Sequence, residues 1–205
     1  MNISSVSFGA KPINDVVIKK YNKSTGVYED YPAKFVKIES GKKADIVAID
    51  KAAKNWKGAF YIGKIATAAH WLDSLPIEIY ALTTQQDKFN KLKSSKILGF
   101  AEMRKDSNFP DYDWLYYLQV KPKAINISGQ DNKTYQHTGT SMIKSLKKIY
   151  KNISLFSADS PYLEEYYKRN GFIEDLEYTR HYLWSSNIFK RLKLRIKKFI
   201  LQLGI

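Results

Sequence analysis

One short segment of the sequence combines residue types that can bind a phosphate group. Residues 136–141 read Gln-His-Thr-Gly-Thr-Ser, and a helical pattern continues from about residue 140 to residue 150. A helix N-terminus presents unpaired backbone N–H groups and a partial positive charge, so it can hold a pyrophosphate. Gly139 would let the backbone approach such an anion closely. The same pattern also fits an ordinary loop and N-cap before a core helix, and with one glycine alone this second interpretation is favoured.

The remaining reactive side chains exclude several kinds of chemistry. The chain contains no cysteine, so it has no disulfide, no thiolate zinc site and no cysteine nucleophile. Its three histidines, His70, His137 and His181, are scattered, and we predict no metal site and no metal cofactor. The first residues lack the pattern of a signal peptide, and no run of 18 apolar residues occurs. We therefore expect a cytoplasmic protein.

Composition and charge indicate one well-buried domain with a basic end. The 205 residues are 44% apolar, and the formal net charge is +14. An excess of this size favours anionic partners such as nucleic acid, acidic lipid headgroups or a polyphosphate cofactor. Residues 187–205 hold six lysines and arginines and no acidic residue. We expect a domain over residues 1–186 and a basic tail over 187–205.

The elements that would position the phosphate-binding segment alternate between strand and helix periods. The run 114–120 is almost entirely apolar, which predicts a central strand buried on both faces. The order of all elements predicts a mixed α/β fold, with one sheet covered by helices. We expect strands at 16–18, 35–38, 77–82, 97–103, 114–120, 153–156, 172–173 and 181–184, and helices at about 44–56, 60–72, 140–150 and from Ser160–Pro161 to Asn170–Gly171.

Two segments, together with this order, resemble the GNAT superfamily of N-acetyltransferases. Residues 118–122, then 136–141 and a helix, resemble the family's strand, Gln/Arg-x-x-Gly-x-Gly/Ala and helix. Residues 166–172, Tyr-Tyr-Lys-Arg-Asn-Gly-Phe, are similar to its Tyr-x-x-x-Gly-Phe ending. The resemblance covers roughly residues 14–184. It implies a single twisted mixed sheet of about seven strands with helices on both faces.

The sequence departs from the family pattern at three places. Ser141 stands where the family has glycine or alanine, and its hydroxyl could either bind phosphate or crowd it. Ser160 stands where the family usually has an asparagine seven residues before its tyrosine. The loop that contains residues 124–130 is longer than the family pattern suggests.

The resemblance implies an enzyme that transfers an acetyl group from acetyl-CoA directly to an amine. It implies that backbone groups near Leu118 and Val120 pair with the pantetheine arm, and that an N–H there stabilises the oxyanion. Ser160 would be a further cofactor contact. The pyrophosphate cradle would consist of Gln136, His137, Thr138, Gly139, Thr140 and Ser141.

Such a transfer needs groups that move protons. Only about one alkylamine in a thousand is unprotonated at neutral pH, so a base helps, and the departing thiol benefits from an acid. Tyr167 occupies the family's tyrosine position and is the predicted acid, with Tyr166 as its competitor. Glu102 and Asp113 are the candidate bases. The tyrosines equally fit core packing, and the carboxylates equally fit solvated strand ends.

The sequence leaves several alternatives for the partner of the tail and for the amine that accepts the acetyl group. Ile188, Leu192, Ile196, Phe199 and Leu203 fall on one helical stripe, which could dock on the domain, join two copies in a homodimer or lie on an anionic membrane surface. We disfavour nucleic acid as the partner. The acceptor could be a protein amine or a small amine. The rival functions are a non-catalytic GNAT-like module that binds coenzyme A, and a basic adaptor on the same scaffold.

Overall fold

The computed structural model describes residues 10–38, 43–56, 77–89, 91–105, 108–121 and 134–202. The predicted helix at 60–72, His70 and the loop segment 124–130 lie outside the described residues. Among the described helices, none is long and apolar enough to cross a membrane.

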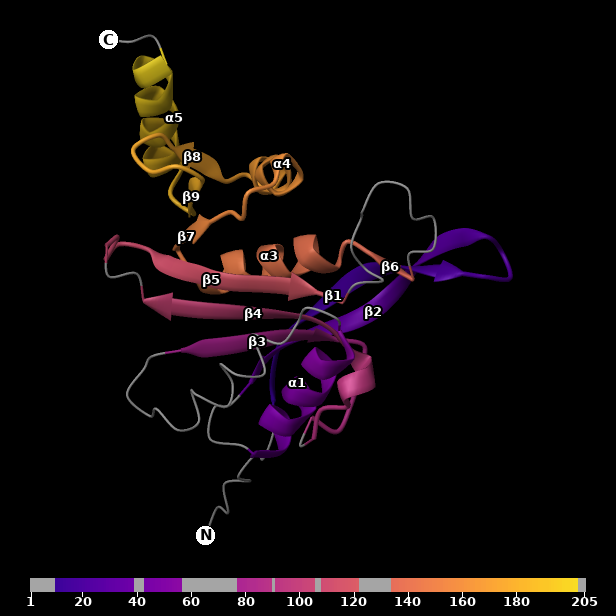
Figure 1. Ribbon diagram of the computed structural model, residues 1–205. Coiled ribbons are helices and arrows are strands. Elements are labelled where there is room, and N and C mark those ends of the chain that lie inside the picture. The colour runs from indigo at the N-terminus through magenta and orange to yellow at the C-terminus, as the bar shows by residue number, and fades with distance from the viewer. Residues whose placement is uncertain are drawn as a thin grey trace. The chain divides into compact units, whose positions relative to one another are not determined.

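The mixed α/β class predicted from the sequence is confirmed (Figure 1). The hydrogen-bonded strand order is β6-β1-β2-β3-β4-β5-β7-β9-β8. These nine strands exceed the expected number of about seven. The strands are β1 Lys11–Asn22, β2 Val27–Ile38, β3 Glu78–Thr83, β4 Ile97–Lys105, β5 Asp113–Val120, β6 Tyr135–Gln136, β7 Asn152–Phe156, β8 Ile173–Asp175 and β9 His181–Ser185. The helices are α1 Lys43–Asn55, α3 Thr138–Ile149, α4 Pro161–Arg169 and α5 Ile188–Gln202, with a short 3-10 helix η1 at Ser94–Lys96.

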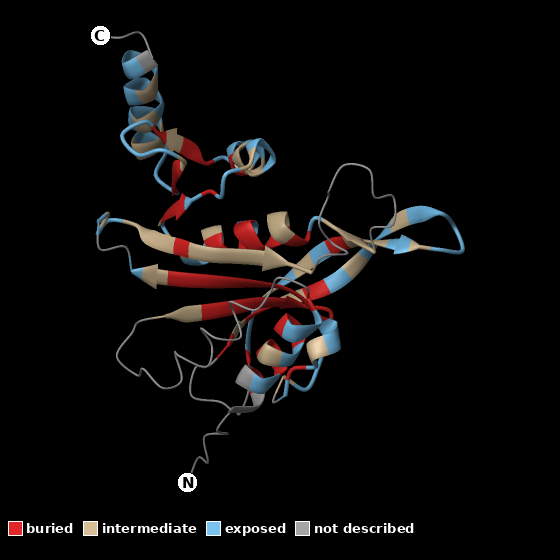
Figure 2. Ribbon diagram, in the orientation of Figure 1, coloured by how far each residue is buried: buried red, intermediate tan, exposed pale blue. Residues whose placement is uncertain are grey.

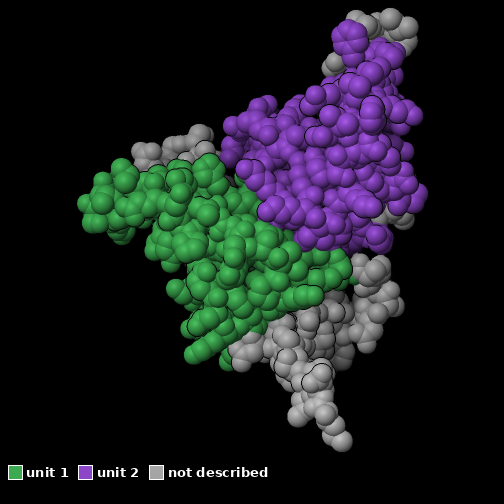
Figure 3. Space-filling view, turned by 180° about the vertical axis from the view of Figure 1, so that it is seen from behind, with its two compact units in different colours: residues 1–102, 117–142 green, residues 103–116, 143–205 purple. Residues whose placement is uncertain are grey.

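The chain divides into two compact units, which Figure 3 shows in different colours. Unit 1 consists of residues 1–102 and 117–142, and unit 2 of residues 103–116 and 143–205. Both β5 and α3 therefore have one end in each unit. The expected boundary between a domain at 1–186 and a tail at 187–205 stays a prediction.

Unit 1 begins with a long antiparallel hairpin. The β1–β2 register runs from Lys11 opposite Lys37 to Asn22 opposite Val27. The connecting turn closes with a hydrogen bond of 2.9 Å from the Gly26 N–H to the Asn22 carbonyl, and Gly26 has the left-handed φ of +71° that favours glycine. Both strands are longer than the sequence predicted, because their polar outer halves are stabilised by pairing with each other.

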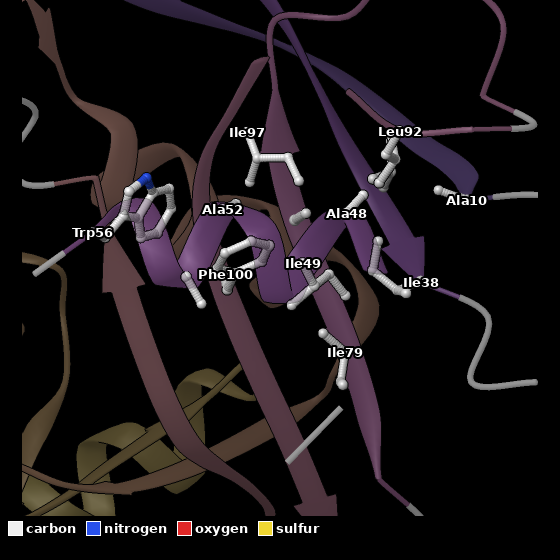
Figure 4. Packing of buried hydrophobic residues seen from close by; sticks show 13 residues of the cluster. Ala10, Ile38, Ala48, Ile49, Ala52, Trp56, Ile79, Leu92, Ile97 and Phe100 are labelled. Carbon is white, nitrogen blue, oxygen red and sulfur yellow. The ribbon is translucent and has the colours of Figure 1, made fainter. Parts of the chain in front are cut away.

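The core of unit 1 lies between α1 and strands β2, β3 and β4 (Figure 4). The apolar stripe of α1 predicts this packing, since residues three and four apart share one helix face. The rings of Trp56 and Phe100 lie 5.1 Å apart between their centroids. The buried cluster consists of Ala10, Val36, Ile38, Ala48, Ile49, Ala52, Ala53, Trp56, Ile79, Ala81, Leu92, Ile97 and Phe100.

Helices cover both faces of β4 within unit 1, as expected. Phe100 packs on the α1 side, and its neighbour Gly99 faces the opposite side, because successive residues of a strand alternate. A Cβ placed on Gly99 would lie 2.5 Å from the sulfur of Met142, the last unit 1 residue of α3. Glycine at position 99 thus permits the close approach of α3.

Unit 2 contains the first half of β5 and strands β7, β9 and β8. β7 pairs with β5 in parallel and with β9 antiparallel, so the sheet is mixed. Where β8 pairs with β9, His181 and Asp175 form a buried pair, with 3.1 Å between Nδ1 and Oδ2. The rings of Phe109 and Phe156 lie 4.4 Å and 4.6 Å from the imidazole, so His181 packs within an aromatic cluster.

The prediction that β5 is buried on both faces is wrong. Of its eight residues only Leu115 is buried, and the others are half-buried. Two of its aromatic residues, Trp114 and Tyr116, lie on one face and cover each other edge to face, with 4.7 Å between the ring centroids. The guanidinium of Arg104 covers Tyr116 at 3.5 Å. The apolar run at 114–120 therefore corresponds to a strand whose aromatic side chains pack on one another, and not to a strand that helices bury on both faces.

Candidate functional site

The predicted cradle begins with a strand that ends abruptly. β6 pairs with β1 through Lys19 opposite Gln136 and Lys20 opposite Tyr135. His137 then takes a left-handed φ of 64°, which is uncommon for a residue other than glycine. This turn ends the strand and starts α3 at Thr138, two residues earlier than the sequence predicted. Gly139 consequently lies in the first turn of α3.

The first turn of α3 leaves polar groups for a ligand. The Ser141 N–H donates to the His137 carbonyl at 2.9 Å, which closes the first turn of the helix. The N–H groups of residues 138–140 precede it and have no acceptor within the helix. Thr138 is only 1% exposed, and its Oγ1 has no hydrogen-bond partner among the described residues. Three N–H donors and an orphaned hydroxyl fit the oxygen atoms of a pyrophosphate.

The Ser141 hydroxyl is turned toward the sheet. Its Oγ donates to the Val17 carbonyl of β1 at 3.4 Å, and the side chain is buried. Serine at this position therefore joins α3 to β1. A small residue suits this buried position, because protein interiors are close-packed.

The second half of β5 presents different side chains to its two faces. Tyr117 packs against the α1 cluster, and its hydroxyl donates to the Gln119 side chain on the same face. Burial raises the pKa of Tyr117 above its ordinary value. Leu118 and Val120 lie on the other face by alternation, and a Cβ placed on Gly99 would be 3.4 Å from Val120. The α3 face of β5 is thus apolar.

The backbone of β5 has unequal pairing along its length. The ladder to β7 joins Asp113 with Ile153 and Trp114 with Ser154. Leu118 and Val120 come after the last residue of this ladder. At the end of the strand, the Lys121 N–H donates to the Leu98 carbonyl of β4 at 2.7 Å.

The two candidate bases have different surroundings. Glu102 is 1% exposed and lies within β4, so the alternative of a solvated strand-end residue is wrong for it. By alternation it shares the face of Phe100. Asp113, in unit 2, begins β5 and forms an ion pair of 2.7 Å with Lys105, so its carboxylate already has a cationic neighbour. Of the two, only Glu102 is a buried carboxylate.

The predicted acid lies on α4 in unit 2. Tyr167 is the buried residue of this helix, with ring centroids 5.9 Å from Phe172 and 6.1 Å from Tyr182. Burial raises the pKa of Tyr167 to about 12, so its hydroxyl is protonated at neutral pH. Its competitor Tyr166 is half-buried. The register of the helix therefore gives the two tyrosines different environments.

The ends of α4 are set by backbone geometry. Ser160 occupies the N-cap position without a side-chain cap bond, and its carbonyl accepts the N–H groups of Leu163 and Glu164 at 3.0 Å and 3.1 Å. Pro161 follows at the first helical position, where a missing N–H costs nothing. Gly171, with φ of +80°, ends the helix as the Asn-Gly pair predicts.

Sequence reasoning missed Lys147. This residue of α3 is half-buried in unit 2, and its ammonium donates to the carbonyl of Asn170 at the end of α4. It lies 4.5 Å from the centroid of the Phe172 ring and 4.6 Å from that of Trp184. Desolvation, together with the nearby charge of Arg191, lowers the pKa of Lys147 to about 8. Nothing in the sequence distinguishes Lys147 among the 34 lysines and arginines.

Comparison with known proteins finds similar solved structures. A protein of Desulfovibrio desulfuricans described as a GNAT-family acetyltransferase aligns at TM-score 0.48 and 10% identity, over 75% of this chain and 98% of that one. A mutant of the AtaT toxin, bound to the C-terminus of the antitoxin AtaR and acetyl-CoA, aligns at 0.48 and 12%, over 75% and 93%. A mutant of KacT aligns at 0.49 and 13%, over 78% and 98%.

No family model and no curated protein sequence matches the chain. The chain is thus similar to solved GNAT acetyltransferases, the superfamily that its motifs resemble.

Proposed function

We propose that this protein is an N-acetyltransferase that moves an acetyl group from acetyl-CoA to an amine. The observation that carries the proposal is the first turn of α3. There, helix N–H groups without an acceptor in the helix lie beside the buried hydroxyl of Thr138, which has no hydrogen-bond partner among the described residues. A buried hydroxyl without a partner is costly, and a ligand oxygen would satisfy it.

The proposed reaction forms one C–N bond and breaks one C–S bond. The amine nitrogen attacks the thioester carbonyl, the amine proton passes to a base, and the sulfur leaves with a proton. The sequence holds no cysteine thiol that could carry the acetyl group, and the proposed transfer is direct, from acetyl-CoA to the amine. A backbone N–H near Leu118 or Val120 would donate to the carbonyl oxygen as it gains charge.

Glu102 is the proposed base, because it is the buried one of the two candidate carboxylates and lies within β4. Tyr167 is the proposed donor to the sulfur. With a pKa of about 12, raised by burial, it holds its proton at neutral pH and can donate a hydrogen bond to the departing thiolate. The acceptor amine is left to experiment, with protein amines and small amines as the two classes.

Thermal denaturation with acetyl-CoA tests the binding step. A ligand that binds only the folded state stabilises it by about 2.7 kcal/mol at a concentration of 100 times its Kd, so the Tm should rise. Gly139→Val places a branched side chain in the first turn of α3 and should abolish the rise. Lys144→Val, in the same helix but exposed and beyond the first turn, is the matched control and should keep it.

A panel of amines, followed by release of free thiol from acetyl-CoA, tests the transfer. Acetylation of one amine class supports the proposed activity and identifies the acceptor. If acetyl-CoA stabilises the protein but no amine is acetylated, the protein is a coenzyme A binding module and not an enzyme. If acetyl-CoA leaves the Tm unchanged, the proposal is wrong.

A further inference from the structure

The C-terminal helix α5 is oriented with its apolar side toward solvent. Figure 2 shows it in the exposed and intermediate colours along its length. At about 100° per residue, six exposed apolar side chains fall within an arc of about 120°. They are between 43% and 77% exposed. This apolar arc consists of Ile188, Phe189, Leu192, Ile196, Phe199 and Ile200. Leu203, which the sequence pattern added to the stripe, lies outside the described residues.

The opposite side of α5 is held to unit 2 by ion pairs. Lys198 pairs with Glu174 of β8 at 2.9 Å. Lys197 pairs with Glu177 at 2.5 Å, and Lys190 pairs with Asp111 at 3.1 Å. Single surface pairs contribute little, but three pairs on one side fix which side turns inward.

The start of α5 is fixed as well. The Asn187 side chain accepts the N–H groups of Phe189 and Lys190 at 2.9 Å and 3.3 Å, which is an N-cap. The Ser185 hydroxyl, bonded to Asn152 at 2.6 Å, accepts the Asn187 N–H at 3.1 Å. The helix therefore leaves β9 in a defined direction with its apolar arc outward.

Two cations flank the apolar arc. With the same angle of about 100° per residue, Lys193 lies about 20° beyond one edge of the arc. Arg195 lies about 20° beyond the other edge. Neither has an ion pair among the described residues. An apolar strip about one third of the circumference wide, with a free cation along each edge, matches a helix that lies in a lipid interface.

We infer that α5 binds the surface of anionic lipid membranes through this apolar arc, with Lys193 and Arg195 at the headgroup level. Charge favours this occupant over a second copy of the chain. Two copies joined through the arc would bring their cations together, and residues 187–205 contain no acid to offset them. An anionic headgroup layer supplies the opposite charge.

Sedimentation with vesicles tests the inference on the full chain. Binding is expected to vesicles of phosphatidylcholine with phosphatidylserine at low salt, and to be weak on phosphatidylcholine alone. Each cation near an anionic surface contributes about a five-fold factor, so Lys193→Gln with Arg195→Gln should lower the partition coefficient about 25-fold. Lys51→Gln with Lys91→Gln removes the same charge from exposed sites in unit 1 and should change it less than about two-fold.

A second pair of variants tests which side of α5 meets the lipid. Because the chain lacks cysteine, one introduced cysteine can carry a polarity-sensitive fluorophore. Ile196→Cys lies in the arc and Leu201→Cys outside it, and the two native side chains are 50% and 46% exposed. On anionic vesicles, the emission of the label at 196 should shift to the blue, and that of the label at 201 should stay near its solution value.

Three results would overturn the inference. The first is equal binding to neutral and anionic vesicles, and the second is an equal shift of both labels. The third is a dimer by light scattering, without vesicles, that Leu192→Ser with Phe199→Ser dissociates, since the arc would then be an interface between copies. Circular dichroism of each variant checks that the fold is retained.

Discussion

The Lys147 ammonium donates a hydrogen bond to the backbone carbonyl of Asn170, the residue at the C-terminal cap of α4. Positive charge at a helix C-terminus is favourable, because the last carbonyls carry partial negative charge. The same ammonium faces the rings of Phe172 and Trp184. One lysine of α3 therefore fixes the turn that follows Tyr167.

Lys147 should make stability depend on pH in the alkaline range. Its pKa is about 8 in the folded protein, lowered by desolvation from 10.5. Between these values the unfolded chain binds more protons at this site than the folded chain, so its contribution to the free energy of unfolding increases with pH. Lys147→Met should remove this increase. The difference between the variant and the wild type, measured by denaturant unfolding across the window, isolates it from other titrations.

The neighbouring residue supplies the control for this measurement. Lys148 is exposed on the same helix, and Lys148→Met should leave the pH dependence as in the wild type. An unchanged slope in the Lys147 variant would mean that the lysine is solvated in the folded protein.

Tyr167→Phe should slow acetyl transfer while leaving acetyl-CoA binding nearly unchanged. The change keeps the buried ring and removes only the proton donor, and loss of an acid–base group costs about 100-fold or more in turnover. Steady-state kinetics on the best acceptor measures it. Tyr166→Phe is the matched control and should retain most of the activity. The opposite result, loss in the Tyr166 variant alone, would transfer the role to that tyrosine.

The same variant should change stability at high pH. Since burial raises the folded pKa of Tyr167 from 10.0 to about 12, the folded protein keeps this proton while the unfolded chain loses it. This contribution is complete below pH 10 and is lost as the pH rises toward 12. Tyr167→Phe should therefore lose less stability than the wild type over that interval.

Thr138→Val should raise the stability of the free protein and weaken its binding of acetyl-CoA. Valine has nearly the same shape, and it removes a buried hydroxyl that has no partner in the described parts of the chain. The free energy of unfolding of the free protein should therefore rise by about 1 kcal/mol. Stabilisation by acetyl-CoA should fall, because the hydroxyl is proposed to bind it. Thr84 is the control. Its buried hydroxyl donates to the Lys96 carbonyl at 3.4 Å, so Thr84→Val should destabilise the protein and leave acetyl-CoA binding intact.

Gly99→Ala should destabilise the protein through Met142. The new Cβ would lie 2.5 Å from the methionine sulfur and 3.1 Å from the Gln119 carbonyl oxygen, so both must shift, at a cost of about 1–3 kcal/mol. Met142→Ala removes the first of these contacts. Denaturant unfolding of the double variant should show a smaller loss than the sum of the two single losses, and strict additivity would refute the contact.

The sequence predicted elements well where one face of an element is apolar. The stripe at 44–56 predicts α1 to within one residue at each end, because burial against the sheet selects that face. In the β1–β2 hairpin, only the apolar segments 16–18 and 35–38 could be recognised. The outer halves are polar and exist through pairing between distant residues, which no local pattern records.

The candidate site shows the same limit. The motif around Gly139 placed a helix start near the right residues, since small polar residues favour N-termini. The orphaned hydroxyl of Thr138 and the position of Lys147 depend on three-dimensional packing. The orientation of α5 could not be predicted from the sequence either, because the residues that pair with it, Asp111 and Glu174, are distant in the sequence.

The division of the chain into two discontinuous units also constrains how it can fold during synthesis. Unit 1 is incomplete until residue 142 has left the ribosome. Residues 103–116 of unit 2 are synthesised before the rest of that unit, residues 143–205, so they lack their packing partners until those residues follow. Contacts between such distant segments form late and slow the search for the native state. The growing chain therefore spends most of its translation with incomplete sheets and exposed strand edges, a stage at which chaperones would bind it.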